Sequence, residues 1–293
     1  MLNYSYPLYR PPSEADNVIL QATYGCSYNN CSFCSMYKSK NYEVRDINEL
    51  FKEIDLLAAS YPQARKVFLA DGDALALDTD YLLELLAYLQ KAFVKLSRVS
   101  VYATAQNLLE KSDTELEKLR ENKLTLIYFG IETGNEELLK KIHKGVNSEQ
   151  LITALNKASK AKMKISATVI LGLGGQVFTT EHMRDTAKII NATTVNYLST
   201  LQLGLAEDVK EKFLKAFHDE FLMLNDSELL DEQLRFLSLL KPSNRVIFRS
   251  NHASNALHLA GTLPKDGERL LNEVQRALDI GEDALVPSFF RGF

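Results

Sequence analysis

Six short apolar runs alternate with longer amphipathic stretches over most of the chain, and this alternation constrains the fold more than any other feature. The runs have the length and β-branched content of buried strands, and helical periodicity follows each of them. Parallel strands need a crossover of a dozen or more residues, and a helix is the usual crossover. The predicted strands are residues 18–24, 66–71, 98–104, 124–131, 164–171 and 195–203.

Chemically reactive side chains follow several of these strands directly, which places them at one edge of the sheet. In α/β barrels the carboxyl edge of the sheet is where active sites form. The pattern predicts an α/β fold, a partial (β/α)6 TIM-like barrel over residues 17–204, open enough to admit a large ligand. Residues 205–293 are predicted to form a mainly helical C-terminal extension packed on the barrel, so the predicted domains are 1–204 and 205–293.

Two features of the predicted extension are local enough to place. Asn225 followed by Glu228 is typical of a helix N-cap, so a break in the helical pattern is expected there. Residues 245–249 are predicted to form a seventh strand, and residues 265–278 a last helix.

All three cysteines of the chain, Cys26, Cys31 and Cys34, lie in one segment of nine residues. An even number of cysteines would suggest disulfides, and four would suggest a closed metal site. A zinc site would need a fourth ligand, and the nearest histidine in the sequence is His143. Three thiolates instead predict a metal centre with one open position, with buried structural thiols or zinc as the alternatives.

The composition limits the partners of the chain. The formal net charge is −4 and 25% of the residues are charged, so no basic excess favours nucleic acid, which is not expected as a partner. No run of about 18 apolar residues is present, so no membrane span is expected. The first residues lack the pattern of a signal peptide. We therefore expect a cytoplasmic protein whose thiols stay reduced.

The cysteine spacing resembles that of the radical S-adenosylmethionine (SAM) enzymes. Their usual motif is C-x3-C-x2-C after the first strand of a partial barrel, and the first gap of this chain is one residue longer. Phe33, directly before Cys34, matches an aromatic residue that packs near the adenine in the family. The resemblance continues at three later strand ends, within residues 17–204. It favours the branch that includes the methylthiotransferases and oxygen-independent coproporphyrinogen oxidase.

The resemblance also implies roles for individual side chains. Residues 71–73 stand where the family has a Gly-Gly-Glu-like segment that contacts the amino group of SAM. In the family, a polar residue at the Glu132 position meets the ribose of SAM, and a basic residue at the Lys144 position meets its carboxylate or ribose side. Residues 170–175 match a segment that passes the adenine. The cofactor-binding residues implied in this way are Phe33, Asp71, Gly72, Asp73, Glu132, Thr133, Lys144, Thr168 and Gly172.

The implied function is a radical SAM enzyme. Three irons of a 4Fe–4S cluster would be bound by Cys26, Cys31 and Cys34, and SAM by the fourth iron. The implied partners are a small-molecule or other substrate and a reductase, flavodoxin or ferredoxin as electron donor. The alternatives are a non-catalytic iron–sulfur or zinc-binding protein and a SAM sensor. The chain has no further cysteine, which argues against an auxiliary cluster. The candidates on the substrate side are Tyr37, Arg45, Arg249, Asn251, His252 and Asn255.

Overall fold

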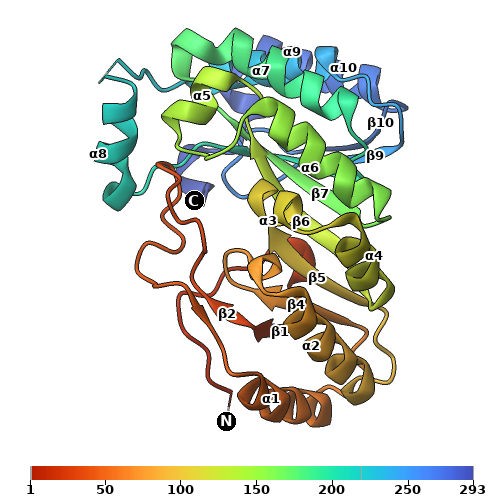
Figure 1. The fold of residues 1–293 in the computed structure, drawn as a ribbon. Coiled ribbons are helices and arrows are strands. Elements are labelled where there is room, and N and C mark those ends of the chain that lie inside the picture. The colour runs from red at the N-terminus through yellow and green to blue at the C-terminus, as the bar shows by residue number, and fades with distance from the viewer. Residues whose placement is uncertain (1, 219, 293) are drawn as a thin grey trace. The chain divides into compact units, whose positions relative to one another are not determined.

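The computed structural model describes residues 2–218 and 220–292 and divides the chain into two compact units (Figure 1). Unit 1 comprises residues up to 29, residues 36–129 and residues 157–165. Unit 2 comprises residues 30–35, residues 130–156 and residues from 166 onward. Because β6 and β7 each cross from one unit to the other, their two ends belong to different units.

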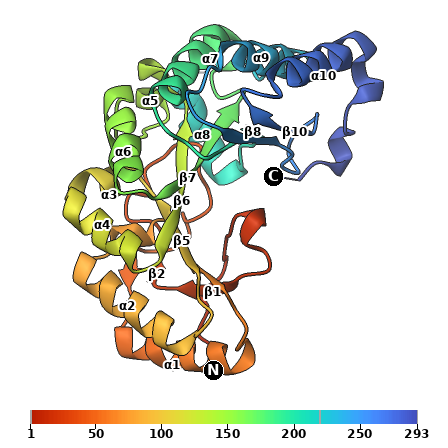
Figure 2. The ribbon, with the colours of Figure 1, turned by 90° about the vertical axis from the view of Figure 1, so that its right-hand side faces the viewer.

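Unit 1 is a parallel sheet with helices on one face (Figure 2). The strands pair in register, with Leu20 opposite Leu69 and Phe68 opposite Ser100. The elements of unit 1 are β1 (Val18–Gln21), β2 (Thr23–Tyr24), β3 (Glu43–Val44), α1 (Ile47–Ser60), β4 (Lys66–Ala70), α2 (Thr79–Ala92), β5 (Arg98–Ala103), α3 (Ala105–Glu110), α4 (Asp113–Glu121) and the first part of β6 (Leu124–Glu132).

Unit 2 contains the end of β6 and most of the elements that follow it. The strand order of the whole sheet is β1-β4-β5-β6-β7-β8-β9-β10, and β10 pairs antiparallel with β9. The further elements are α5 (Glu136–Lys141), α6 (Ser148–Lys160), β7 (Lys164–Leu171), α7 (Gly175–Ala192), β8 (Tyr197–Gln202), α8 (Glu207–Ala216), α9 (Asp226–Leu239), β9 (Val246–Ser250), β10 (Leu259–Leu263) and α10 (Gly267–Ile280).

Local sequence explains where several elements begin. Asp46 caps α1 by accepting the amides of Asn48 and Glu49 at 2.9 and 3.1 Å. The helix then buries Leu50 and Ile54 completely against the sheet of unit 1. Burying a leucine or isoleucine side chain stabilises a fold by about 1.5–3 kcal/mol, so an amphipathic face of this kind fixes the helix on the sheet.

The predicted fold class is confirmed, and all six predicted strands are present. The first predicted strand is divided, because Thr23 and Tyr24 leave the main sheet and pair with β3. The predicted seventh strand is present as β9, and Asn225 forms the predicted cap of α9. Two short helices, α3 and α4, follow β5, since Thr104 and Ser112 each form a capping box. The domain boundary at 204/205 stays a prediction.

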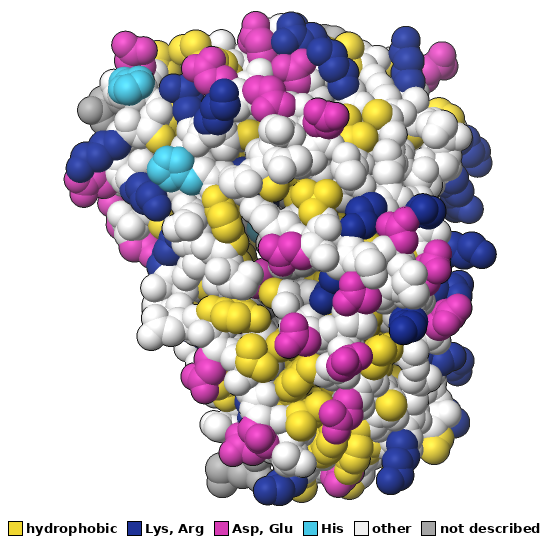
Figure 3. All heavy atoms as spheres, in the orientation of Figure 1, with side chains coloured by type: hydrophobic (Ala, Val, Ile, Leu, Met, Phe, Trp, Pro, Cys, Tyr) yellow, Lys and Arg dark blue, Asp and Glu magenta, His cyan; other side chains and the backbone are white. Residues whose placement is uncertain are grey.

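The charged side chains on the face drawn in Figure 3 do not form a large patch of one sign. Lysine and arginine side chains lie among aspartate and glutamate side chains there, without a broad region of one sign. No helix in the described part of the chain is both long and apolar enough to cross a membrane.

Arg45, a candidate on the substrate side, is instead part of a buried ion pair in unit 1. Its guanidinium donates to the two carboxylate oxygens of Glu53 at 2.7 and 3.0 Å and to the carbonyl of Gln21 at 3.1 Å. Both side chains are 5% exposed or less. Because Glu53 lies in the middle of α1, the pair ties that helix to the end of β1.

We expect Arg45→Met to destabilise the protein by about 3–5 kcal/mol, because it leaves the Glu53 carboxylate buried without its cation. The double variant Arg45→Met/Glu53→Met should recover much of that loss, since no unpaired charge then remains. Denaturant unfolding of the three proteins measures both effects. A double variant no more stable than Arg45→Met would contradict this account of the pair.

Candidate functional site

The cysteine segment, residues 26–34, passes from one unit into the other. Cys26 belongs to unit 1, whereas Cys31 and Cys34 belong to unit 2. All three residues are partly buried. The surroundings of Cys26 and of the other two cysteines are therefore described separately.

In unit 1, Cys26 lies against the loop that follows β4. The amide of Gly72 donates to the carbonyl of Gly25 at 2.8 Å. A Cβ placed on Gly72 would overlap the Cα and Cβ of Cys26. Only glycine allows the two segments to approach this closely, so Gly72 has a steric role beside the first cysteine.

Asp71 is completely buried at the end of β4 and has a left-handed backbone, with φ of 69°. Its carboxylate accepts from the amide of Gly25 at 2.9 Å, from Gln21 Nε2 at 3.1 Å and from Lys40 Nζ at 2.9 Å. Non-glycine residues with positive φ are uncommon and tend to occur at functional sites. Lys40 follows the cysteine segment, so Asp71 contacts the chain on both sides of the three cysteines.

Asp73 is also completely buried and binds the residue after Cys26. It accepts the amide of Ser27 at 2.8 Å, the hydroxyl of Ser27, and Asn107 Nδ2 at 3.2 Å. Asn107 is in turn the third residue of α3, where its side chain completes a capping box. The start of α3 thereby orients the Asp73 carboxylate.

In unit 2, Lys144 and Glu132 form an ion pair beside the second part of the cysteine segment. Lys144 Nζ lies 3.1 Å from Glu132 Oε1, and the two side chains are 13% and 11% exposed. Burial lowers the pKa of Lys144, but the negative charges of Glu132, Cys31 and Cys34 outweigh it, and the net pKa is raised. The ammonium therefore lies close enough to both thiols to stabilise their thiolate forms.

Two backbone features make room for this pair. Glu132 is the last residue of β6 and has a left-handed backbone, with φ of 62°. A Cβ on Gly130 would overlap the Glu132 carboxylate and lie 3.1 Å from Lys144 Nζ. Glycine at position 130 is thus required for the ion pair to lie over the strand.

A hydrogen-bond chain anchors the residues that follow Glu132. The carbonyl of Ile170 can only accept, so His182 Nε2 carries the proton and donates to it at 2.8 Å. His182 Nδ1 then accepts from the Thr133 hydroxyl at 2.8 Å, and that hydroxyl accepts the Asn135 amide at 3.1 Å. Burial lowers the pKa of His182 to about 4, so the imidazole is neutral at pH 7.

The end of β7 is bound by a buried carboxyl group from α9. Glu232 accepts from the amide of Gly172 and, at 2.8 Å, from the hydroxyl of Thr179. Gly172 has φ of 76°, so β7 ends in the same left-handed turn as β6. Burial raises the pKa of Glu232 to about 7, because the two donors that contact it are neutral and desolvation disfavours its charge.

Phe33 packs on an apolar cluster of unit 2. The segment is fixed there by the amide of Ser32, which donates to the carbonyl of Ile142 at 2.9 Å. The buried members of the cluster are Leu138, Ile142, Ile170, Leu173, Leu203, Phe213 and Phe217.

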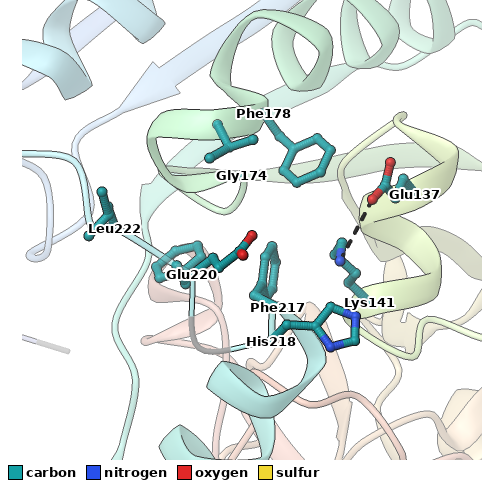
Figure 4. Close-up of a pocket in the computed structure, with 10 residues that line it drawn as sticks. Glu137, Lys141, Gly174, Phe178, Phe217, His218, Glu220 and Leu222 are labelled. Atoms are coloured by element: carbon teal, nitrogen blue, oxygen red, sulfur yellow. Dashed lines mark ion pairs between the residues drawn. The ribbon is translucent and has the colours of Figure 1, made fainter.

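A pocket of about 270 Å³ opens beside this cluster (Figure 4). Phe178 and Phe217 form apolar walls, and Lys141 Nζ lies 5.8 and 5.3 Å from the centres of their rings. Lys141 also lies 3.7 Å from Glu137 and donates to the carbonyl of Ala216. The chain's own ammonium group therefore occupies the cation–π position of this pocket.

The donor set fits an iron–sulfur cluster. Three thiols lie within nine residues, Gly72 leaves space at Cys26, and Lys144 lies near Cys31 and Cys34. In residues 2–218 and 220–292 no group of three Cys, His, Asp or Glu side chains lies close enough together to hold a single metal ion. A cluster does not need that grouping, since each thiolate binds a different iron.

A family model for the radical SAM superfamily matches residues 20–190, which is more than half of the chain. The chain belongs to the radical SAM superfamily. Enzymes of this superfamily use a 4Fe–4S cluster and SAM, so these are the cofactors of this radical SAM protein, and the predicted recognition and cofactors are confirmed.

The match to each curated relative covers only part of that relative's length. The protein MJ0865 of Methanocaldococcus jannaschii, provisionally named a methylthiotransferase, is 26% identical over 184 residues, 58% of this chain and 39% of its own. The heme chaperone HemW of Bacillus subtilis is 24% identical over 171 residues, 57% of this chain and 45% of its own. The chain thus spans less than half the length of both.

Among solved structures, coproporphyrinogen III oxidase HemN from Escherichia coli has a TM-score of 0.56. It is 16% identical, and the match covers 76% of this chain and 51% of HemN. At this identity the likeness supports the fold alone.

The predicted site residues fall into two groups. Asp71, Gly72 and Asp73 surround Cys26 in unit 1, and Glu132 and Lys144 lie near the other two cysteines in unit 2. The buried hydroxyl of Thr133 binds His182, whereas Thr168 is partly exposed on β7. The proposed contacts of these residues with SAM stay predictions.

Other residues of the site carried no local signal in the sequence. Lys40, Asn107 and His182 bind residues 31 or more positions away. On the substrate side, Asn255 is buried and binds Thr200 and Ser250, whereas Arg249 is exposed.

We expect stability to fall as the pH rises from about 4.5 to about 7, because folding raises the pKa of Glu232 and the folded state therefore binds its proton more tightly. Glu232→Gln stays neutral and should remove this decline. At pH 8 the variant should be more stable than the unmodified protein, by on the order of 1–3 kcal/mol. Unfolding at pH 5 and pH 8 measures the difference.

The matched control is Asp231→Asn, an exposed carboxylate on the same helix. It should leave the pH dependence unchanged. Equal pH dependence in Glu232→Gln and the unmodified protein would show that Glu232 titrates normally.

Proposed function

We propose that this chain cleaves SAM reductively and uses the product radical to abstract hydrogen from a substrate. When bound, the cluster and SAM supply a one-electron cleavage that yields methionine and a 5′-deoxyadenosyl radical. The single observation that carries the proposal is the ion pair of Lys144 with Glu132, placed beside Cys31 and Cys34 in unit 2.

The proposed role of Lys144 follows from its charge and surroundings. Its ammonium has three donors, and Glu132 accepts one of them. The positive charge of this ammonium can offset the carboxylate of SAM while the nearby thiolates bind iron. Glu132 can accept from the ribose hydroxyls, since a carboxylate has lone pairs on both oxygens.

Phe33 and the strand ends complete the proposed site of unit 2. Phe33 lies on the apolar cluster that includes Ile170 and Leu173, which suits contact with an adenine ring. Thr168 and Gly172 line the same strand end. His182 accepts the hydroxyl of Thr133 after β6, and Glu232 accepts the amide of Gly172 after β7, so both strand ends are held in place.

The electron donor and the substrate are also proposals. Electrons would come from a reductase, flavodoxin or ferredoxin, and the substrate is a small molecule. Methylthiotransferase and heme-chaperone activity belong to relatives that this chain matches over less than half their length, and the contacts of the described residues favour neither activity.

We expect Cys31→Ala to abolish both the brown colour and SAM cleavage, because one of three iron ligands is lost. The measurement is anaerobic reconstitution with iron and sulfide, followed by dithionite and SAM and chromatography of 5′-deoxyadenosine. The unmodified protein should contain about four irons per chain, as a 4Fe–4S cluster requires. Normal cleavage by the variant would refute the assignment, and binding of SAM without deoxyadenosine in the unmodified protein would indicate a sensor.

We expect Lys144→Met to retain iron but to bind SAM roughly 10- to 100-fold more weakly, the effect of losing one or two charge-assisted hydrogen bonds. Lys140→Met is the matched control, since Lys140 is exposed on α5. Calorimetric titration of SAM into the reconstituted proteins measures the difference. Equal affinities for the two variants would remove Lys144 from the SAM site.

A further inference from the structure

The loop that follows β4 binds the backbone on both sides of Cys26. Asp71 accepts the amide of Gly25, directly before the cysteine, at 2.9 Å. Asp73 accepts the amide of Ser27, directly after it, at 2.8 Å, and also the Ser27 hydroxyl. Two buried carboxylates thus bind the backbone amides of the residues on either side of the first cysteine.

Gly72, between the two aspartates, adds a steric constraint. Its amide donates to the Gly25 carbonyl, and the side chain of Cys26 lies where a Cβ of residue 72 would be. The loop after β4 therefore determines both the backbone conformation at Cys26 and the direction in which its side chain leaves the backbone.

We propose that Asp71 and Asp73 are positioning residues for Cys26. They set the backbone of the cysteine segment before the cluster binds, so that the first thiol meets iron in one orientation. This inference rests on the proposed function, and it gives the two aspartates a role different from the binding of the amino group of SAM.

The burial of both carboxylates favours positioning over cofactor binding. Both residues are 0% exposed, and Asp71 already has the Lys40 ammonium at 2.9 Å. An incoming amino group would have to displace donors that the chain itself supplies. Removing a donor from a buried carboxylate is costly, because the anion loses its compensation in a place without water.

Asp73 also has a consequence for the chemistry of the cluster. The donors that contact it, from Ser27 and Asn107, are neutral, and it forms no ion pair among the described residues. Its carboxylate contacts Ser27, the residue next to the thiolate ligand Cys26. A nearby negative charge disfavours the addition of an electron, so Asp73 should keep the reduction potential of the cluster low.

The first test is Asp73→Asn in the full chain. It keeps the shape but removes the charge, and it places an amide nitrogen opposite the donor of Asn107. We expect iron loss to a chelator to be roughly 10- to 100-fold faster, the factor for one charge-assisted hydrogen bond. The reduction potential of the remaining cluster should rise. SAM affinity per remaining cluster should be unchanged.

A second measurement needs no cluster. In the metal-free protein, alkylation followed by mass spectrometry gives the relative reactivity of Cys26, with Cys31 and Cys34 as internal standards. Asp73→Asn should change the reactivity of Cys26 relative to the other two. Asp78→Asn, an exposed carboxylate that makes no cap hydrogen bond, is the matched control and should change nothing.

The exchange Asp73→Asn/Asn107→Asp separates positioning from a general loss of structure. The pair keeps one carboxylate and one amide, with donor and acceptor reversed, and an aspartate can still complete the capping box at position 107. We expect the double variant to restore iron retention lost in either single variant. Asn107→Asp alone places two carboxylates together and should be the least stable.

The outcomes are distinct. If Asp73→Asn retains iron and the reactivity of Cys26 but loses SAM affinity, Asp73 binds SAM and the positioning role is refuted. The same holds if the exchanged pair does not rescue iron retention while both single variants remain folded by circular dichroism. Absence of iron or deoxyadenosine in the unmodified protein would instead refute the proposed function, and the alkylation result would still decide the positioning role.

Discussion

Asp71 and Asp73 are buried without contact to water, and a buried carboxylate must find donors within the chain. In unit 1 those donors are mainly the peptide groups and side chains next to Cys26, together with Lys40. The conformation of the cysteine segment is therefore coupled to the end of β4. A loop with little apolar content gains from these polar contacts the order that packing supplies elsewhere in the unit.

In unit 2, two buried carboxyl groups also find their donors within the chain, but only one of those donors is charged. Glu132 at the end of β6 pairs with Lys144, whereas Glu232 at the end of β7 receives only the neutral donors of Gly172 and Thr179. Burial raises the pKa of Glu232 to about 7, whereas Glu132 has the ammonium of Lys144 as its partner at 3.1 Å. One carboxyl group is thus suited to a charged cofactor site, and the other holds a strand end in place.

The sequence predicted the elements whose signals are local. Asn225 marks a helix start by its own side chain, and the strands follow from apolar runs. The contacts of the site depend on long-range packing: Lys40 binds a residue 31 positions away, His182 one 49 positions away and Glu232 one 60 positions away. The periodic patterns of apolar residues that predict helices and strands do not predict contacts over such distances in the sequence. Strand β10 was missed, since its five residues include glycine and threonine and lack a clear apolar run.

The resemblance to radical SAM enzymes located the strand ends but not the use of each side chain. Asp71 and Asp73 stand where an amino-group ligand is expected, yet in unit 1 their oxygens contact the loop that bears Cys26. The carboxylates follow a strand end in both interpretations, so sequence position alone cannot distinguish them. Only the partners of the oxygens do so.

Lys144 shows why the chemistry of a side chain matters beyond its charge. Its ammonium is compact and can turn its three donors independently, whereas an arginine would present a rigid planar fork. At 3.1 Å it contacts Glu132, and the negative charges of two cysteines also raise its pKa. A cation among three anionic groups stays protonated, and in the proposed site it would also offset the carboxylate of SAM. Its flexible stem would let the ammonium adjust to that carboxylate while it stays near Glu132.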